Sequence, residues 1–296
     1  MVPPIVIGAH PKRHEPEPIR LGVMLARLTH APIDVVSTFW FDATRQRTAP
    51  DEYGRILRDD VHKALEHAIG DPERTPGELR VHVTSGSAPH ALHETASQVG
   101  AGVIVVGSTH RGAVGRVALG NTTDRVLERA PCPVAVAPRG FRDEGVPPER
   151  VGVAFVDTPG GWAALRAGAA IARHTEASLT AYTIVDSHTH TRDRTRAEAA
   201  VGRAIAEHAH DIRCEARVLN DGGVDALVEE SRGLDFLVRG SRGHGPVPTP
   251  LAFGFPNKLA RRVACPFVVV PPGADQPLVA LFSARAGAGH QKVVAS

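Results

Sequence analysis

One phrase of this sequence occurs twice at a fixed interval, and the repeat constrains the fold more than any other feature. The first copy spans residues 103–138 (VIVVGSTHRGAVGRVALGNTTDRVLERAPCPVAVAP) and the second spans 236–271 (FLVRGSRGHGPVPTPLAFGFPNKLARRVACPFVVVP). Gly107 and Gly240 lie 133 residues apart, and the cysteine in the closing part of each copy keeps the same spacing. Two anchors at one offset indicate a duplicated domain.

Short apolar runs alternate with helical patterns in each half of the chain. In the first half, strands are expected at 5–9, 33–39, 79–84, 103–107 and 133–137, and helices at 19–29, 51–69, 89–99 and 121–129. In the second half, strands are expected at 151–156, 179–185 and 213–219 before the repeated phrase, and helices at 162–174, 197–208 and 224–231. Strands that alternate with helices predict a parallel sheet covered on both faces.

The length of 296 residues predicts two domains, at about 150 residues each. We expect one domain at 1–138 and a second at 149–272, joined by a linker at 139–148 whose sequence RGFRDEGVPP has linker composition. The remaining tail, 273–296, contains an apolar stretch at 278–282 that we interpret as an edge strand.

Composition excludes several classes of protein. Aromatic residues make up only 4% of the chain, which argues against a base-stacking platform and therefore against a nucleic-acid partner. No apolar run approaches the roughly 18 residues of a membrane span. The first strand begins within four residues and leaves no room for a secretory signal. Three cysteines, an odd number, fit a reducing compartment. We expect a cytoplasmic protein without a membrane partner.

The histidines and cysteines do not form a pattern that requires a metal. Sixteen histidines include the pairs His188/His190 and His208/His210, but neither pair has a cysteine or carboxylate cluster at ligand spacing. A solvated polar surface is the better interpretation. The cysteine before the last strand of each half is typical of a small buried hydrophobic residue rather than a redox centre.

Three stretches together carry a resemblance to a known family. They are AFVDTPGGWAALRAGAAIA, the strand-to-loop segments VVGSTHRG and LVRGSRGHG, and the closing PCPVAVAP and ACPFVVVP. In these stretches the chain resembles the universal stress protein family in a tandem two-domain form, and the resemblance covers nearly all of it. It implies two tandem flavodoxin-like (Rossmann-like) three-layer α/β sandwiches, each with a five-stranded parallel sheet of order 3-2-1-4-5. It also implies an intramolecular pseudo-dimer, in which the two halves pack about a pseudo-two-fold axis through their last strands.

Nucleotide-binding members of that family carry Gly, two residues, Gly, nine residues, then Gly followed by Ser or Thr. Glycines after a strand let backbone amides approach a phosphate, and the last pair lies at a helix N-terminus that favours an anion. An Asp at the end of the first strand resembles the group that contacts the ribose, but His10 stands there in the first half. Neither half contains a Walker loop.

The first half keeps part of this motif. Gly107 is present and Gly120 follows after the nine-residue spacer, but His110 replaces the second glycine. Asn121 and then Thr122 stand where the family has Ser or Thr, and Asn is an adequate helix cap. His110 either donates a hydrogen bond to a phosphate or fills the pocket, and the sequence leaves both alternatives open.

The second half keeps a different part. Asp157, Gly240 and Gly243 are present, but Phe253 replaces the third glycine and Gly254 takes the place of Ser or Thr. We therefore expect the helix-terminal part of this site to be lost.

Asp157 has an enzymatic and a non-enzymatic interpretation. The carboxyl end of a strand is where α/β sheets gather ligand groups, so Asp157 is a candidate acid or base. No partner is predicted beside it, so a ribose-binding or loop-capping role is favoured, and Trp162 is interpreted as core packing.

These observations support three functional hypotheses. The first is a universal stress response protein that binds ATP or another adenine nucleotide as a regulator or sensor, without dedicated catalysis and with degenerate sites. The second is a protein that binds no nucleotide and acts through a protein partner. The third is a slow nucleotide hydrolase, which would need a general base and a metal-holding carboxylate that we do not find.

Overall fold

A computed structural model describes the greater part of the chain. The described residues are 1–10, 16–39, 55–56, 59–61, 63, 78–108, 114, 117, 120–185, 191–220, 223–241 and 262–283. Of the helix expected at 51–69, the described residues are helical, and the others lie outside the described ranges.

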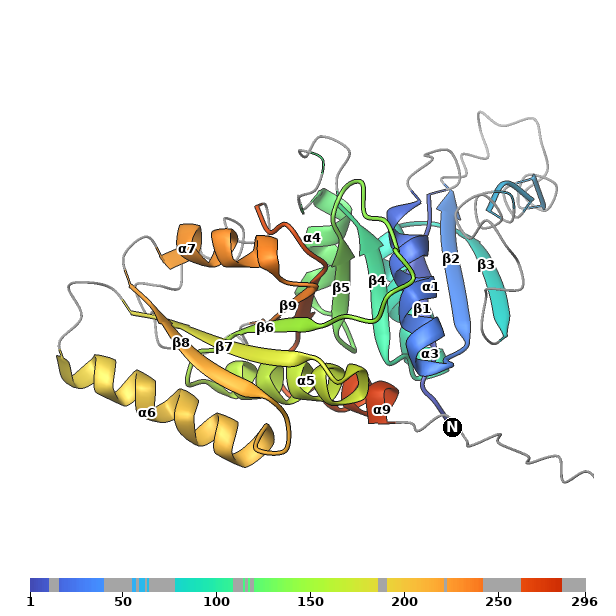
Figure 1. Cartoon of the computed structure of the whole chain (residues 1–296). Coiled ribbons are helices and arrows are strands. Elements are labelled where there is room, and N and C mark those ends of the chain that lie inside the picture. Colours follow the sequence, from blue (N-terminus) through green and yellow to red (C-terminus); the bar gives the residue numbers. More distant parts are fainter. Residues whose placement is uncertain are drawn as a thin grey trace, which may run out of the picture.

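The elements follow the predicted order in both halves (Figure 1). Those of the first half are β1 (Ile5–Gly8), α1 (Glu17–Thr29), β2 (Ile33–Phe39), β3 (Leu79–Ser85), α3 (Ala88–Val99), β4 (Val103–Gly107), α4 (Asn121–Glu128) and β5 (Val134–Ala137). Those of the second half are β6 (Arg150–Ala154), α5 (Pro159–Thr175), β7 (Ser178–Ile184), α6 (Thr191–His208), β8 (Cys214–Leu219), α7 (Gly223–Glu230), η2 (Ser231–Gly233), β9 (Phe236–Gly240), β10 (Phe267–Val270) and α9 (Gln276–Ser283).

The strands form one ten-stranded sheet with the order β3-β2-β1-β4-β5-β10-β9-β6-β7-β8. Within each half all neighbouring strands are parallel, and each half has the predicted order 3-2-1-4-5. The predicted fold is therefore confirmed. Because the two halves share one sheet, the exact domain limits stay a prediction.

The halves join through their last strands, β5 and β10, which pair antiparallel. Ala135 lies opposite Val268, and the repeat offset of 133 residues maps these two positions onto each other. A pseudo-two-fold axis therefore passes between them, as the resemblance implied. Each apolar strand covers the edge that the other would expose.

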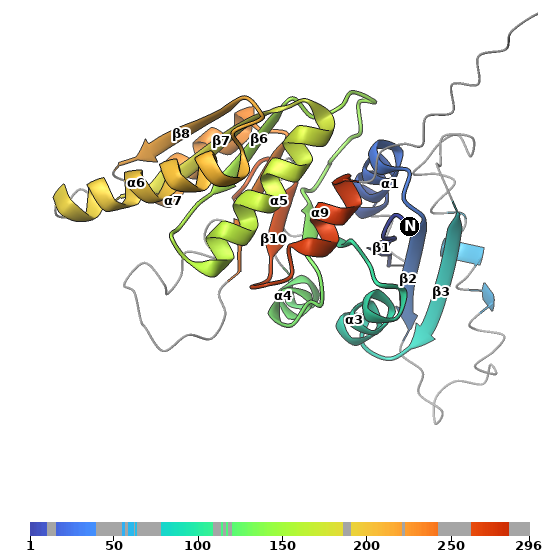
Figure 2. The same ribbon diagram turned by 90° about the horizontal axis from the view of Figure 1, so that it is seen from below.

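Helices cover both faces of the sheet and enclose two cores. Figure 2 shows α1, α5 and α9 across one face, with α6 beside α5. Buried side chains of α3, α4 and α7 form the core of the other face. None of the helices in the described ranges is long and apolar enough to span a membrane.

The expected edge strand at 278–282 is wrong, because this segment lies within helix α9. Leu278, Leu281 and Phe282 are buried and have the spacing of one helix face. A Cβ built on Gly102 of the first half would lie 3.1 Å from the Cβ of Leu281. Since β5 and β10 occupy each other's edges, the tail packs across the join as a helix instead of extending the sheet there.

The predicted linker lies along α1. The main-chain N–H of Gly140 donates to Glu17 Oε1 at 2.7 Å. The Arg27 guanidinium donates to both carboxylate oxygens of Asp143, at 2.7 and 2.9 Å. A bidentate pair of this kind fixes both distance and orientation, so this segment is docked on the first half.

Candidate functional site

The N-terminus of α4 lies at the carboxyl end of β4, where the first-half motif was predicted. Gly107 ends β4, and Gly120 precedes α4 in an extended conformation with φ −99° and ψ 169°. The Thr123 hydroxyl donates to the Gly107 carbonyl at 3.1 Å and holds the first turn of the helix against the strand. The structure therefore brings Gly107, Gly120, Asn121 and Thr122 together.

The first turn of α4 presents donors to solvent. The Asp124 N–H makes the first intrahelical bond, to Gly120 O at 2.9 Å, so the N–H groups before it have no partner within the helix. Asn121 and Thr122 are exposed. Free N–H groups and the helix dipole favour an anion at such a position.

Val117, three residues before Gly120, is tied to the other half of the molecule. Val117 is fully buried, and its N–H donates to the carbonyl of buried Val263 at 2.8 Å. Directly after β4, the N–H of Ser108 donates to Ala137 O at 3.0 Å. His110 lies outside the described residues. His10, at the end of the first strand, is exposed.

In the second half, Asp157 is held by the helices on one face of the sheet. Its Oδ1 accepts a hydrogen bond from Trp162 Nε1 at 2.9 Å, and its Oδ2 lies 3.8 Å from the Arg203 guanidinium. The ring of Trp162 packs edge-on against Phe155 and His208, at centroid distances of 5.9 and 5.8 Å. Trp162 is thus a packing residue. The Asp157 carboxylate contacts side chains of both α5 and α6.

Gly240 has a packing role that Gly107 lacks. A Cβ on Gly240 would lie 2.2 Å from the main-chain oxygen of Gly160, because the start of α5 rests on the end of β9. A Cβ on Gly107 would lie 3.4 Å from Pro18, an ordinary contact. Packing therefore requires a glycine at 240 but not at 107. Gly243, Phe253 and Gly254 lie outside the described residues.

The cysteines are unsuited to nucleophilic chemistry. Cys132 and Cys265 are buried and Cys214 is half-buried, and all three are free. Burial raises the pKa of the Cys132 thiol to about 12 and, together with the charge of Glu215, that of Cys214 to about 11. Burial also raises the pKa of Cys265. These thiols are protonated at neutral pH.

A search of the described ranges for three His, Cys, Asp or Glu side chains able to hold a metal ion finds no such group. His208 packs on Trp162, as described above, and His210 is exposed. His188 and His190 lie outside the described residues.

Sequence reasoning missed a buried carboxylate on β2. Asp34 is fully buried, its Oδ1 lies 2.6 Å from His82 Nε2, and the guanidinium of Arg80 is 3.9 Å away. His82 also lines a cavity of about 400 Å³ beside α3. The signal in the sequence was a charged residue inside the apolar run IDVV. The group lies between β2, β3 and α3, apart from the motif residues on β4 and α4.

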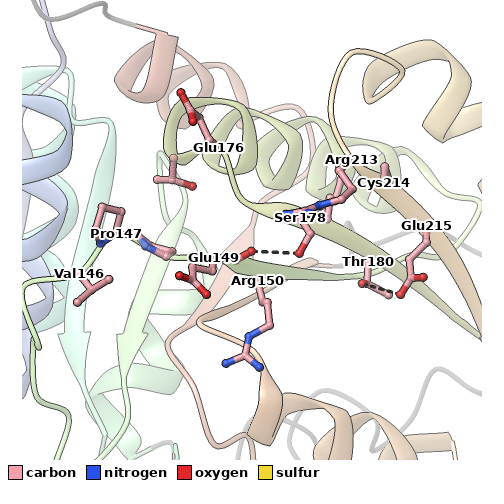
Figure 3. Close-up of a pocket in the computed structure, with 13 residues that line it drawn as sticks. Val146, Pro147, Glu149, Arg150, Glu176, Ser178, Thr180, Arg213, Cys214 and Glu215 are labelled. Carbon is pink, nitrogen blue, oxygen red and sulfur yellow. Dashed lines mark hydrogen bonds between the residues drawn. The ribbon is translucent and has the colours of Figure 1, made fainter.

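A second cavity, of about 990 Å³, lies beside the first residues of β6, β7 and β8 (Figure 3). The linker forms one side of it. The other side is formed by Arg150, Ser178 and Cys214, which are the first residues of β6, β7 and β8 respectively. The charges around it are mixed, with Glu149 and Glu215 beside the arginines. It therefore contains none of the predicted site residues and shows no single ligand preference.

The fold and the motif positions can now be compared with known proteins. Residues 1–138 match the model of the universal stress protein family. The first half of this chain belongs to the universal stress protein family. A universal stress protein from Archaeoglobus fulgidus DSM 4304 is similar in structure, with a TM-score of 0.63 and 18% identity, over 92% of this chain and 97% of that one. A putative universal stress protein from Pseudomonas aeruginosa UCBPP-PA14 has a TM-score of 0.61 and 15% identity, over 95% and 97%. Both matches extend over both halves and show the same fold there.

Among the described residues, the structure brings the predicted site residues of the first half together, whereas Gly243 of the second half lies outside the described ranges. In the first half the motif residues converge at α4, joined by Thr123, which the sequence reasoning missed. The available signal in the sequence was the hydroxyl of Thr123, two residues after Asn121 at the start of the helix. In the second half, Asp157 and Gly240 are engaged in contacts of their own.

Proposed function

We propose that this universal stress protein is a regulator that binds an adenine nucleotide, such as ATP, in its first half and has no dedicated catalysis. The observation that carries the proposal is the position of α4, whose exposed first turn is fixed beside Gly107 by the Thr123 hydrogen bond. The absence of a packing requirement for glycine at 107 supports a role in admitting a ligand.

The groups at this position suit a phosphate. The main-chain N–H groups of the first turn bind the anion, and the Asn121 amide and Thr122 hydroxyl donate further hydrogen bonds. His110 either donates one more or narrows the pocket.

A binding role fits the described residues better than hydrolysis does. Hydrolysis of a nucleotide needs a general base and, in most cases, a metal-holding carboxylate near the phosphates. The second-half carboxylate that the sequence suggested, Asp157, is engaged with Trp162. We further propose a cytoplasmic location, on the ground that Cys132, Cys214 and Cys265 are all free thiols.

Thermal-shift measurements with ATP, ADP, AMP and cyclic AMP test this proposal. The variant Gly120→Val places a branched side chain at the start of α4 and should abolish the stabilisation by nucleotide. Gly233→Val is the matched control, because a Cβ there meets no atom within 4 Å. It should respond to nucleotide as the wild type does.

Two other outcomes would move the function elsewhere. Loss of the nucleotide response in Asp157→Ala but not in Gly120→Val would place the site in the second half. No stabilisation of the wild type by any of the four nucleotides at millimolar concentration would contradict nucleotide binding and favour a protein that acts through a protein partner.

A further inference from the structure

The main-chain N–H of Val117, in the first half, is bonded to the second half of the molecule. It donates to the carbonyl of Val263 at 2.8 Å, and both residues are fully buried in the core that α3, α4 and α7 cover. Val117 lies three residues before Gly120, which precedes α4. A residue close before the candidate nucleotide site is thus held from across the join between the halves.

The peptide group between Val263 and Ala264 is hydrogen-bonded on both sides. Its C=O accepts from Val117, and its N–H, that of Ala264, donates to the Ser231 hydroxyl oxygen at 3.1 Å. Ser231 is fully buried, and its hydroxyl donates in turn to the carbonyl of Val228 in α7 at 2.6 Å. A hydroxyl that both donates and accepts has a fixed orientation, and the bonds of such a chain strengthen one another. We call these three hydrogen bonds the Ser231 relay.

The residues at the equivalent positions of the repeat are unsuited to a relay in the opposite direction. The residue 133 positions after Val117 is Pro250, whose nitrogen carries no hydrogen to donate. The residue 133 positions before Ser231 is Gln98, which is exposed and donates to Glu94 within α3 at 3.2 Å. The Ser231 relay therefore acts in one direction, from the second half to the first.

The start of α4 lies in the sequence between two fixed residues. On one side, Val117 is bonded to the second half, and on the other the Thr123 hydroxyl donates to the Gly107 carbonyl of β4 at 3.1 Å. Gly120 and Asn121 lie between them. A hydrogen bond weakens steeply when its donor moves out of line with its acceptor, so donors at the start of α4 bind an anion well only while they are held in place. Loss of either fixed residue should therefore weaken binding.

We propose that Ser231, in the second half, is a positioning residue for the nucleotide site of the first half, an inference that rests on the proposed function of α4. Ser231 acts through main chain and touches no nucleotide. It orients the peptide group of Val263 and Ala264, the carbonyl of that peptide holds Val117, and Val117 holds the start of the site. The second half is then a scaffold that sets the affinity of the first half for its ligand.

The relay is tested without nucleotide, by amide hydrogen exchange of Val117 in ¹⁵N-labelled protein. The rate is referred to that of Val105, a buried residue of β4, so that a change in global stability does not count. In Ser231→Ala this relative protection should fall about fivefold, the factor that an ordinary hydrogen bond is worth. Thr29→Val is the matched control, because it removes a buried hydroxyl that donates to Leu25 O at 2.8 Å, on the opposite face of the sheet. Equal relative protection in the two variants, or an unprotected Val117 in the wild type, would overturn the proposal.

The effect on the site is tested by calorimetric titration of ATP into the wild type, Ser231→Ala and Thr29→Val. The dissociation constant should rise about fivefold in Ser231→Ala and stay unchanged in Thr29→Val, although both variants lose stability. An unchanged dissociation constant in Ser231→Ala would overturn the positioning role. No ATP binding by the wild type would contradict the proposed function and this role with it, whereas the exchange comparison would still decide whether the relay holds Val117.

Discussion

At the scale of single residues, Gly107 and Gly240 end equivalent strands but meet different neighbours. The main chain of Gly160 touches Gly240, whereas the ring of Pro18 leaves room beside Gly107. The sequence alone could align the two glycines, because they occupy the same position in the two copies of the repeat. It could not distinguish their roles, because these depend on how closely the first helix of the same half approaches the end of the strand.

Gly240→Ala should lower the free energy of unfolding by about 3 kcal/mol, because a methyl group 2.2 Å from the Gly160 oxygen must displace main chain. Urea unfolding followed by circular dichroism measures this loss. Gly202→Ala is the control, since a Cβ in that part of α6 meets no atom within 4 Å. It should instead raise the stability by about 0.5–1 kcal/mol through helix propensity. A neutral effect of Gly240→Ala would contradict the close approach.

Asp275 gives the molecule a site of acid sensitivity. Burial by itself raises the pKa of Asp275, but the hydrogen bond and charge of Arg166 lower it, and the net shift is downward. The stabilisation by this carboxylate is therefore complete above about pH 4 and is lost as the pH falls through the lower folded-state value.

Asp275→Asn should cost about 2 kcal/mol of unfolding free energy at pH 7, and this difference from the wild type should shrink below pH 4. Urea unfolding at pH 7 and pH 3.5 measures both differences. Asp211→Asn removes a similar arginine partner at the surface and should change the stability less. A difference for Asp275→Asn that persists unchanged at the lower pH would contradict this sign.

At the scale of elements, periodicity predicted most helices and strands, but not the contacts that place them. The start of α4 at Asn121 was readable from the sequence, whereas the bond from Thr123 to Gly107 depends on the approach of helix and strand. The tail segment 278–282 was misassigned because a short apolar run fits a strand as well as a helix. This segment is helical because its apolar residues pack against α5 and beside Gly102, and these contacts cannot be read from the sequence.

Thr123→Val should lower the unfolding free energy by about 1 kcal/mol and weaken nucleotide binding, because it removes the hydroxyl that fixes α4 to β4. Thr122→Val makes the same change at an exposed position and is the matched control for stability. Urea unfolding and nucleotide titration report the two effects. Equal stability of the two variants would contradict a structural role for the Thr123 bond.

At the scale of the whole molecule, duplication predicted the symmetry. The repeat indicated two equivalent halves, and the resemblance to the universal stress protein family implied an axis through their last strands. The pairing of Ala135 with Val268 has that symmetry. The repeat could not predict what breaks the symmetry. Among the described residues, the first half has no counterpart of the tail helix α9, because that helix belongs to a segment present once.

Because one sheet runs through both halves and α9 bridges them, the molecule should unfold as a single cooperative unit. Hydrogen exchange with mass spectrometry at increasing urea compares peptides from β1 and β4 with peptides from β6 and β9. The two sets should lose protection at the same urea concentration. Separate transitions would show that the halves are independent despite the shared sheet.

The most direct test of the functional account is the stoichiometry of nucleotide binding by isothermal titration calorimetry of the full chain. If the first half alone holds the site, AMP and ATP should bind at one molecule per chain, and Gly120→Val should remove this binding while Gly233→Val retains it. Two molecules per chain, or one that survives Gly120→Val, would contradict the assignment of the site to the N-terminus of α4.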